Sequence, residues 1–179
     1  FSRRAMIHRM NGDLANDLGN LSQRVLSMIF KNCSGVMPAL PATAAPEDSA
    51  LLDAADAMLG KVRAHMDLQS FHEALRCIWE VVSDANKYVD TTAPWVLKKT
   101  DPLRMGEVLA VLAETIRQAA ILVQPVMPGS ASKILDQLGV ADDQRGFDML
   151  AGAGRIAAGV EISKPEPVFP RFVEEEGEV

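Results

Sequence analysis

The chain has 179 residues, of which 48% are hydrophobic, 23% are charged and only 5% are aromatic. This length and balance fit one globular domain that buries a single sizeable core, with room for an appendage. No run of about twenty apolar residues and no basic-then-apolar leader is present. We therefore expect no membrane span, no secretory signal and a cytoplasmic location.

The net charge of −6 disfavours a protein that coats long nucleic-acid duplexes, because such a protein needs a basic surface. Much of this charge is local, since the C-terminal tail contains Glu174, Glu175, Glu176 and Glu178. Residues 1–24 and residues 86–104 each carry two more positive than negative charges. These weakly basic segments are compatible with a short RNA footprint.

Leucine, alanine and methionine are plentiful, which favours helix over strand because unbranched side chains lose little rotamer freedom in a helix. Residues 2–33 are predicted to be helical, with a bend at Asn11-Gly12, because apolar side chains recur at steps of three and four. Prolines indicate a loop over residues 33–47. The next helix is predicted from about Asp48 to Met66.

A further helix is predicted from about Ser70 to Asp90, and another begins at Pro102 and ends or kinks at Pro125. A shorter helix follows from about Ser130 to Leu138. Residues 159–163 alternate like a short strand, and the prolines beyond them exclude a packed helix. The predicted fold is all-α: an antiparallel bundle of four to five helices over residues 1–150, with an extended proline-rich C-terminal strap and acidic tail over residues 151–179.

The strongest functional signal lies where the predicted helix ending near Asp90 meets Pro94 and Trp95. Pro94 cannot continue a helix and disfavours the helical conformation at the residue before it, so Trp95 is expected on a rigid corner. An indole at a helix end can stack on a nucleobase, and the nearby Asn86 and Asp90 can hydrogen-bond to base edges. The competing interpretation is structural: Trp95 is a core plug, because aromatic side chains dominate the cores of small domains.

Motifs for catalysis are missing from the sequence. It has no glycine-rich phosphate loop and no local signature of a Ser-His-Asp or Cys-His pairing. The two cysteines, Cys33 and Cys77, lack the paired spacing of a zinc site, and the three histidines are scattered at positions 8, 65 and 72. We therefore expect no catalytic residue, no metal site and no cofactor site in this chain.

Three tracts occur in one order along the chain: Asn16-Asp17-Leu18-Gly19-Asn20-Leu21 followed by Arg24, then Asn86-Lys87-Tyr88-Val89-Asp90 with Ala93-Pro94-Trp95, and finally Lys164-Pro165-Glu166-Pro167-Val168-Phe169-Pro170. With the helix end Gln124-Pro125-Val126-Met127-Pro128, they resemble the C-terminal anticodon-binding domain of bacterial methionyl-tRNA synthetases over essentially the whole chain. The resemblance implies an all-α bundle that recognises the CAU anticodon loop of methionine tRNAs.

The resemblance also implies what lies elsewhere. Activation of methionine with ATP belongs to a catalytic domain of the same polypeptide, and this domain is not in this chain. Any zinc ion would also belong to that domain. The chain by itself is expected to bind tRNA without charging it. The proline-rich strap resembles the segment that returns toward that catalytic domain.

Residue roles follow from the same resemblance. Trp95, held by Pro94, is the position that stacks on an anticodon base, and Asn11 matches the asparagine of the first helix that reaches the anticodon. Some members have an arginine four residues after that asparagine. This chain has Ala15 there, so the role falls to Arg24 or is lost.

Asn86 and Asp90 complete the predicted anticodon-binding set. The carboxylate of Asp90 is predicted to repel phosphates and acceptor groups of non-cognate anticodons. Asn86 has a competing interpretation, as do Asn16 and Asn20: a buried amide network that joins helices.

Helical spacing separates some of these residues. Asn16, Asn20 and Arg24 are four residues apart and share one helix face. Asn11 and Arg24 face nearly opposite ways on an unbroken helix, so only a bend near Gly12 brings both to one ligand.

Two other functions remain open at this point. A sister class I synthetase, such as the cysteine or valine enzyme, has a similar bundle and reads other bases. A helical protein-interaction module with Trp95 as its anchor fits the acidic net charge. Binding to RNA weakens steeply with salt, whereas an apolar protein interface does not.

Overall fold

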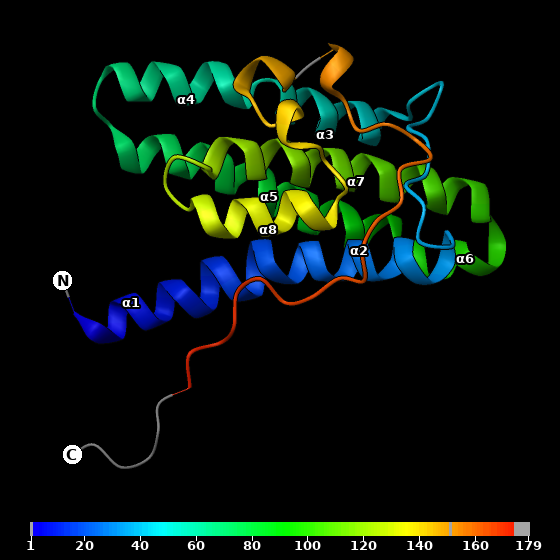
Figure 1. Ribbon diagram of the computed structural model, residues 1–179, viewed down its shortest axis with the longest axis horizontal. Coiled ribbons are helices and arrows are strands. Elements are labelled where there is room, and N and C mark those ends of the chain that lie inside the picture. The colour runs from blue at the N-terminus through cyan, green and yellow to red at the C-terminus, as the bar shows by residue number, and fades with distance from the viewer. Residues whose placement is uncertain (1, 151, 174–179) are drawn as a thin grey trace.

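The computed structural model describes residues 2–150 and 152–173, and its regular elements are helices, which confirms the predicted all-α class (Figure 1). The chain begins with α1 (Arg3–Arg9), the π-helix η1 (Met10–Gly19) and α2 (Asn20–Asn32). It continues with α3 (Pro46–Asp56), α4 (Met58–Asp67), α5 (Phe71–Thr92), α6 (Pro94–Thr100), α7 (Pro102–Val123) and α8 (Pro128–Gln137). Short 3₁₀ turns follow at η2 (Asp142–Gln144), η3 (Phe147–Met149) and η4 (Gly152–Gly154). Among the helices described, none is both long enough and apolar enough to cross a membrane.

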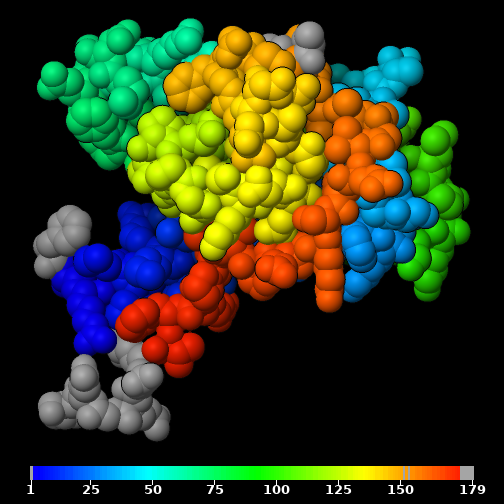
Figure 2. Space-filling view, in the orientation of Figure 1, coloured from blue at the N-terminus to red at the C-terminus, as the bar shows by residue number. Residues whose placement is uncertain are grey.

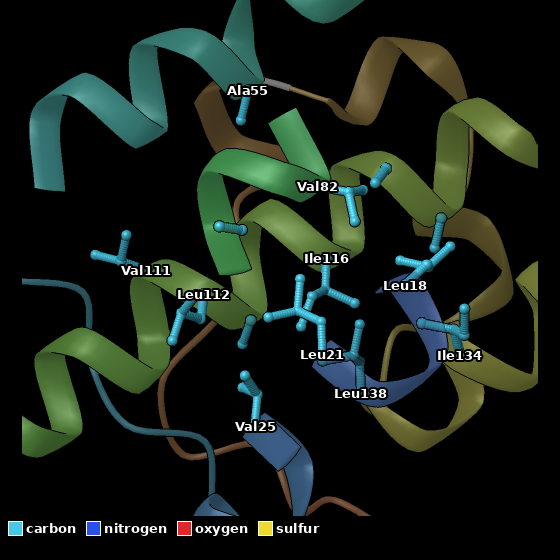
Figure 3. Packing of buried hydrophobic residues seen from close by; sticks show 14 of the residues in the cluster. Leu18, Leu21, Val25, Ala55, Val82, Val111, Leu112, Ile116, Ile134 and Leu138 are labelled. Atoms are coloured by element: carbon cyan, nitrogen blue, oxygen red, sulfur yellow. The ribbon is translucent and has the colours of Figure 1, made fainter. Parts of the chain in front are cut away.

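Helix α7 is the centre of the bundle. It contacts α2, α3, α5, α6 and α8, and its side chains are buried almost all the way round. A helix whose surface is mostly apolar all the way round needs such an enclosed position. Figure 3 shows Ile116 of α7 close to Leu21 of α2 and to Leu138, which follows α8.

The N-terminal helix differs from its prediction between Met10 and Gly19. Instead of a bend at Asn11-Gly12, this stretch is a π-helix, whose i→i+5 hydrogen bonds widen the turn. A Cβ at Gly19 would lie 2.8 Å from the Leu14 carbonyl oxygen and 3.1 Å from Cδ2 of Phe169. Glycine therefore permits both the wide turn and the close approach of the C-terminal strap.

The helix predicted from Asp48 to Met66 is wrong in two respects. It starts earlier, at Pro46, a first-turn position where the missing N–H of proline costs nothing. It is also divided at Ala57 into α3 and α4. The two helices have different main partners, since α3 packs mainly on α7 whereas α4 packs on α5. The break at Ala57 allows each helix to align with its own partner helix.

The corner after α5 is present as predicted. Ala93 has φ 44° and ψ 61°, the left-handed conformation, and Pro94 disfavours the right-handed one at that residue. The chain then enters α6, a helix that the sequence pattern does not indicate, with Pro94 at its first position. Trp95 therefore lies in the first turn of a short helix.

Residues 155–173 form the strap, which runs back along the bundle to the N-terminal helices (Figures 1 and 2). Of the predicted strand at 159–163, only an isolated antiparallel bridge between Val36 and Glu161 forms. Further along, the Gln137 amide pairs with the backbone of Glu166 in both directions, at 3.1 and 2.8 Å. The predicted acidic tail, at Glu174 and beyond, lies outside the described residues.

A buried carboxylate joins three helices at the end of the bundle that carries α6. Asp48 of α3 is fully buried and accepts hydrogen bonds from Tyr88 Oη of α5 at 2.6 Å and from both terminal nitrogens of Arg104 of α7 at 2.6 and 2.7 Å. Burial alone would raise the pKa of the Asp48 carboxyl. The hydrogen bonds from Arg104, Tyr88 and the Ala45 N–H outweigh burial, so this pKa lies below its ordinary value of 3.8.

We expect Asp48→Ala to lower the free energy of unfolding by about 3 kcal/mol at pH 7, because it leaves the Arg104 guanidinium without its buried partner. A carboxyl whose pKa is lowered by folding stabilises the fold above its unfolded pKa, and that contribution is lost as the pH falls through its folded pKa. The difference between wild type and variant should therefore shrink below about pH 4. Urea denaturation across this pH range measures both effects.

The matched control is Asp53→Ala, since Asp53 is an exposed aspartate on the same helix. It should change the free energy of unfolding by less than about 0.5 kcal/mol at either pH. Equal losses for the two variants, or a loss at Asp48 that does not depend on pH, would contradict the structural assignment.

Candidate nucleic-acid interface

Trp95 lies on the surface. Its side chain is 45% exposed, whereas the preceding Pro94 is buried and fixes the start of α6. The interpretation of Trp95 as a core plug is therefore wrong. The second tryptophan has the structural role, because Trp79 is half-buried and its indole N–H donates to the Asp13 carbonyl at 3.0 Å.

Arg24 and Asp90 meet at the indole of Trp95. The guanidinium carbon of Arg24 lies 5.5 Å from the ring centroid of Trp95, within the range of a cation–π contact. The same guanidinium donates to Oδ1 of Asp90 at 2.9 Å. Residues from α2, α5 and α6 thus form one exposed surface with an aromatic ring, a cation and a carboxylate, which we call the Trp95 surface.

Asn86 lies one turn before Asp90 on α5 and is half-buried. Its amide donates to Oδ1 of Asp17 on η1 at 2.5 Å and to the Val82 carbonyl at 3.2 Å. Burial and the neighbouring Asp13 raise the pKa of the Asp17 carboxyl, although the bond from Asn86 opposes them. Asn86 therefore joins α5 to η1 next to the Trp95 surface, and its predicted role toward RNA stays a prediction.

Asn11 is not close to these residues. It precedes Arg24 by thirteen positions, which is roughly 15–20 Å along the helix axis. Its amide pairs with the backbone of Phe172 in the strap, donating at 3.0 Å and accepting at 2.8 Å. The structure brings Arg24, Asp90, Pro94 and Trp95 together with Asn86 beside them, and it places Asn11 at the strap.

Asn20 is a candidate that the predicted site leaves out. It is exposed, one helical turn before Arg24, so the two side chains share a face. The signal was in the sequence, because Asn20 and Arg24 have the spacing of four that the resemblance implies for the asparagine and its arginine. The buried-network interpretation is wrong for Asn20 and for Asn16, since both are exposed.

No group of three or more His, Cys, Asp or Glu side chains is arranged to hold a metal ion within residues 2–150 and 152–173. A cavity of about 620 Å³ lies between η1, the start of α5 and the turn after α7. It is lined by Trp79 and Met10 among others. In Figure 1 the start of α5 and the end of α7 lie at the end of the bundle opposite α6.

The helical fold and the sequence together place this chain among the α-helical anticodon-binding domains. The sequence profile described as "Anticodon binding domain of methionyl tRNA ligase" matches residues 38–179. The chain belongs to this family.

Curated relatives extend the similarity to nearly the whole chain. The methionine–tRNA ligase of Brucella suis biovar 1 (strain 1330) is 51% identical over 175 residues, which are 97% of this chain and 33% of the relative. The ligase of Rhizobium meliloti (strain 1021) is 49% identical over 173 residues, with the same coverage. The chain thus spans about a third of the length of the curated relatives that it matches.

A solved structure agrees with this assignment. The crystal structure of the apo form of Mycobacterium tuberculosis methionyl-tRNA synthetase matches the bundle with a TM-score of 0.93 and 46% sequence identity. The match covers 98% of this chain and 36% of that one. Both the predicted family and the predicted helical bundle are therefore confirmed.

We expect Arg24→Ala and Asp90→Ala each to change the free energy of unfolding by less than about 1 kcal/mol, because their ion pair is open to solvent. Urea denaturation at neutral pH measures the change. Arg104→Ala is the contrasting variant, because its guanidinium joins the buried Asp48 and its loss should cost about 3 kcal/mol. A large loss of stability for Arg24→Ala would instead give the Trp95 surface a structural role.

Proposed function

We propose that this chain recognises the CAU anticodon of methionine tRNAs as part of a methionine–tRNA ligase. The observation that carries the proposal is the half-exposed Trp95 with the Arg24 guanidinium over its ring. An exposed ring at a fixed corner offers a stacking platform to an unpaired base, and stacking is available to any base. Selectivity then comes from hydrogen-bonding groups beside the ring, for which Asn20 and Arg24 are suited by exposure and spacing.

The proposal includes the activity of the complete polypeptide. The relatives that share this domain are named as methionine–tRNA ligases and are about three times as long as the matched region. A cytoplasmic enzyme that activates methionine with ATP and charges tRNA would carry that chemistry in its remaining part. This chain by itself binds tRNA without charging it.

Titration of the chain with a fluorescently labelled anticodon stem-loop tests the proposal. We expect a preference for CAU over a loop with a changed first base. Trp95→Ala should weaken the CAU complex by about 1–3 kcal/mol, the effect of one base-stacking aromatic side chain. Val96→Ala is the matched control, because Val96 is the next residue and is 51% exposed, yet it has no ring to stack.

Salt dependence separates RNA binding from a protein-interaction module. Affinity for the stem-loop should fall steeply with salt, and Arg24→Gln should lower the slope of log K against log salt by about one if Arg24 contacts a phosphate. Binding that is absent, or that ignores both the anticodon and Trp95, would leave the interaction module as the better explanation.

We also propose that the catalytic part of the same polypeptide contacts the end of the bundle opposite α6. Exposed apolar side chains gather at that end on three segments, namely Met6 of α1, Leu68 and Phe71 at the α4–α5 turn, and Val126 after α7. Val126 also lines the cavity of about 620 Å³ between η1 and α5. Exposed apolar surface of this kind marks an interface.

Hydrogen exchange tests this second contact. In a full-length ligase that contains this chain, backbone amides of α1 and of the α4–α5 turn should exchange more slowly than in the 179-residue chain alone. Amides of α6 should exchange equally in both. Equal rates at α1 and at the turn would contradict the proposed contact.

A further inference from the structure

A small polar groove lies between the N-terminal helix and the strap, one helical turn before Arg24. Its volume is about 230 Å³. The helix contributes Asn16, Asn20 and Gln23, and the strap contributes Phe169 and Arg171. Figure 1 shows the strap, in orange to red, passing along the blue N-terminal helices.

The walls of the groove are held in place by specific contacts. Gly19 leaves room for the ring of Phe169 on the helix. The Asn11 amide pairs in both directions with the backbone of Phe172, and Arg171 donates to Asn16. The strap therefore has a defined position against the helix.

One polar atom of a residue that lines the groove has no partner. Oε1 of Gln23 is buried and accepts no hydrogen bond from any group in the described part of the chain. Its Nε2 is used, because it donates to Ser27 Oγ at 3.3 Å and to the Pro165 carbonyl at 3.5 Å. An unpaired buried carbonyl oxygen is costly, so the chain alone leaves the Gln23 amide incompletely satisfied.

The chemistry of the groove suits one nucleotide. Amides offer donors and acceptors to a base edge or a ribose hydroxyl, the ring of Phe169 offers an apolar surface, and the guanidinium of Arg171 attracts a phosphate. The volume is below the roughly 300–1,000 Å³ of sites that take drug-sized ligands, so a single nucleotide is the fitting size. A bare anion would need neither the ring nor the amides.

We propose that this groove is a second RNA subsite, which holds one unpaired nucleotide next to the base stacked on Trp95. The proposal rests on the proposed function and deepens it, because it gives the strap a direct role in binding the anticodon loop. Asn20 lines the groove and lies one turn, about 5.4 Å, from Arg24 along the helix.

The test uses the 179-residue chain and the CAU stem-loop, with a set of loops in which one nucleotide at a time outside the anticodon is abasic. Gln23→Met keeps the size of the side chain and removes the amide. It should weaken binding of the intact loop about 3- to 10-fold, the effect of one neutral hydrogen bond on an equilibrium constant. One abasic position should abolish the difference between Gln23→Met and wild type, while Trp95→Ala should still weaken binding of that abasic loop.

Two further variants keep the test decisive. Arg171→Gln removes an exposed charge without touching the core and should weaken the same loop, with a shallower salt dependence. Gln137→Met removes the amide that anchors the strap at Glu166, away from the groove, and should leave affinity unchanged. Urea denaturation of each variant reports whether it is folded.

The outcomes separate the two proposals. The second subsite would be overturned if Trp95→Ala weakens binding while Gln23→Met and Arg171→Gln leave it unchanged. The proposed function would still stand in that case. An equal effect of Gln137→Met would overturn the second subsite as well, because loss of strap anchoring would then explain the result. A wild-type chain that does not prefer CAU would overturn the proposed function and the subsite with it.

Discussion

The buried carboxylate of Asp48 is the contact on which the geometry of the Trp95 surface depends. It receives the hydroxyl of Tyr88 and both arms of Arg104, so α3, α5 and α7 are joined at one point. Tyr88 lies less than two turns before Ala93, where α5 ends, and Arg104 lies in the first turn of α7, directly after α6. Both ends of the segment that carries Trp95 are thereby fixed. A buried charge is tolerable here because charged and neutral donors occupy its oxygens.

The backbone converts this fixed frame into an exposed indole. Ala93 in the left-handed conformation reverses the chain, and buried Pro94 sets the direction of α6. Trp95 is then held by backbone geometry, and its ring does not need to be buried to be placed. Arg24 reaches the ring from α2, which is packed on the central helix α7, so the two sides of the surface rest on the same core. A ring that is ordered before binding loses less entropy when a base stacks on it.

Sequence patterns predicted the features that follow from local chemistry. Apolar spacing predicted the long helices, and the Pro94 corner predicted that α5 would end. Patterns could not show that Ala57 divides α3 from α4 or that residues 10–19 widen into a π-helix, because both depend on which partner each segment packs against. The same holds for the site. Neither the pairing of Asn11 with Phe172 nor the approach of Arg24 to Trp95 is encoded in a local spacing, since each joins distant parts of the chain.

The acidic composition takes on a different meaning once the positions of the charges are known. Phosphate contacts attract any RNA alike, and sequence is read through base contacts. At the Trp95 surface, Asp90 neutralises part of the charge of Arg24, so attraction for phosphates in general is reduced. A stacked base is neutral and loses little from this carboxylate, and Arg24 remains oriented over the ring. A weak positive electrostatic potential therefore helps a domain that binds one short loop to discriminate against other RNA sequences. The net charge of −6 is consistent with such selective binding.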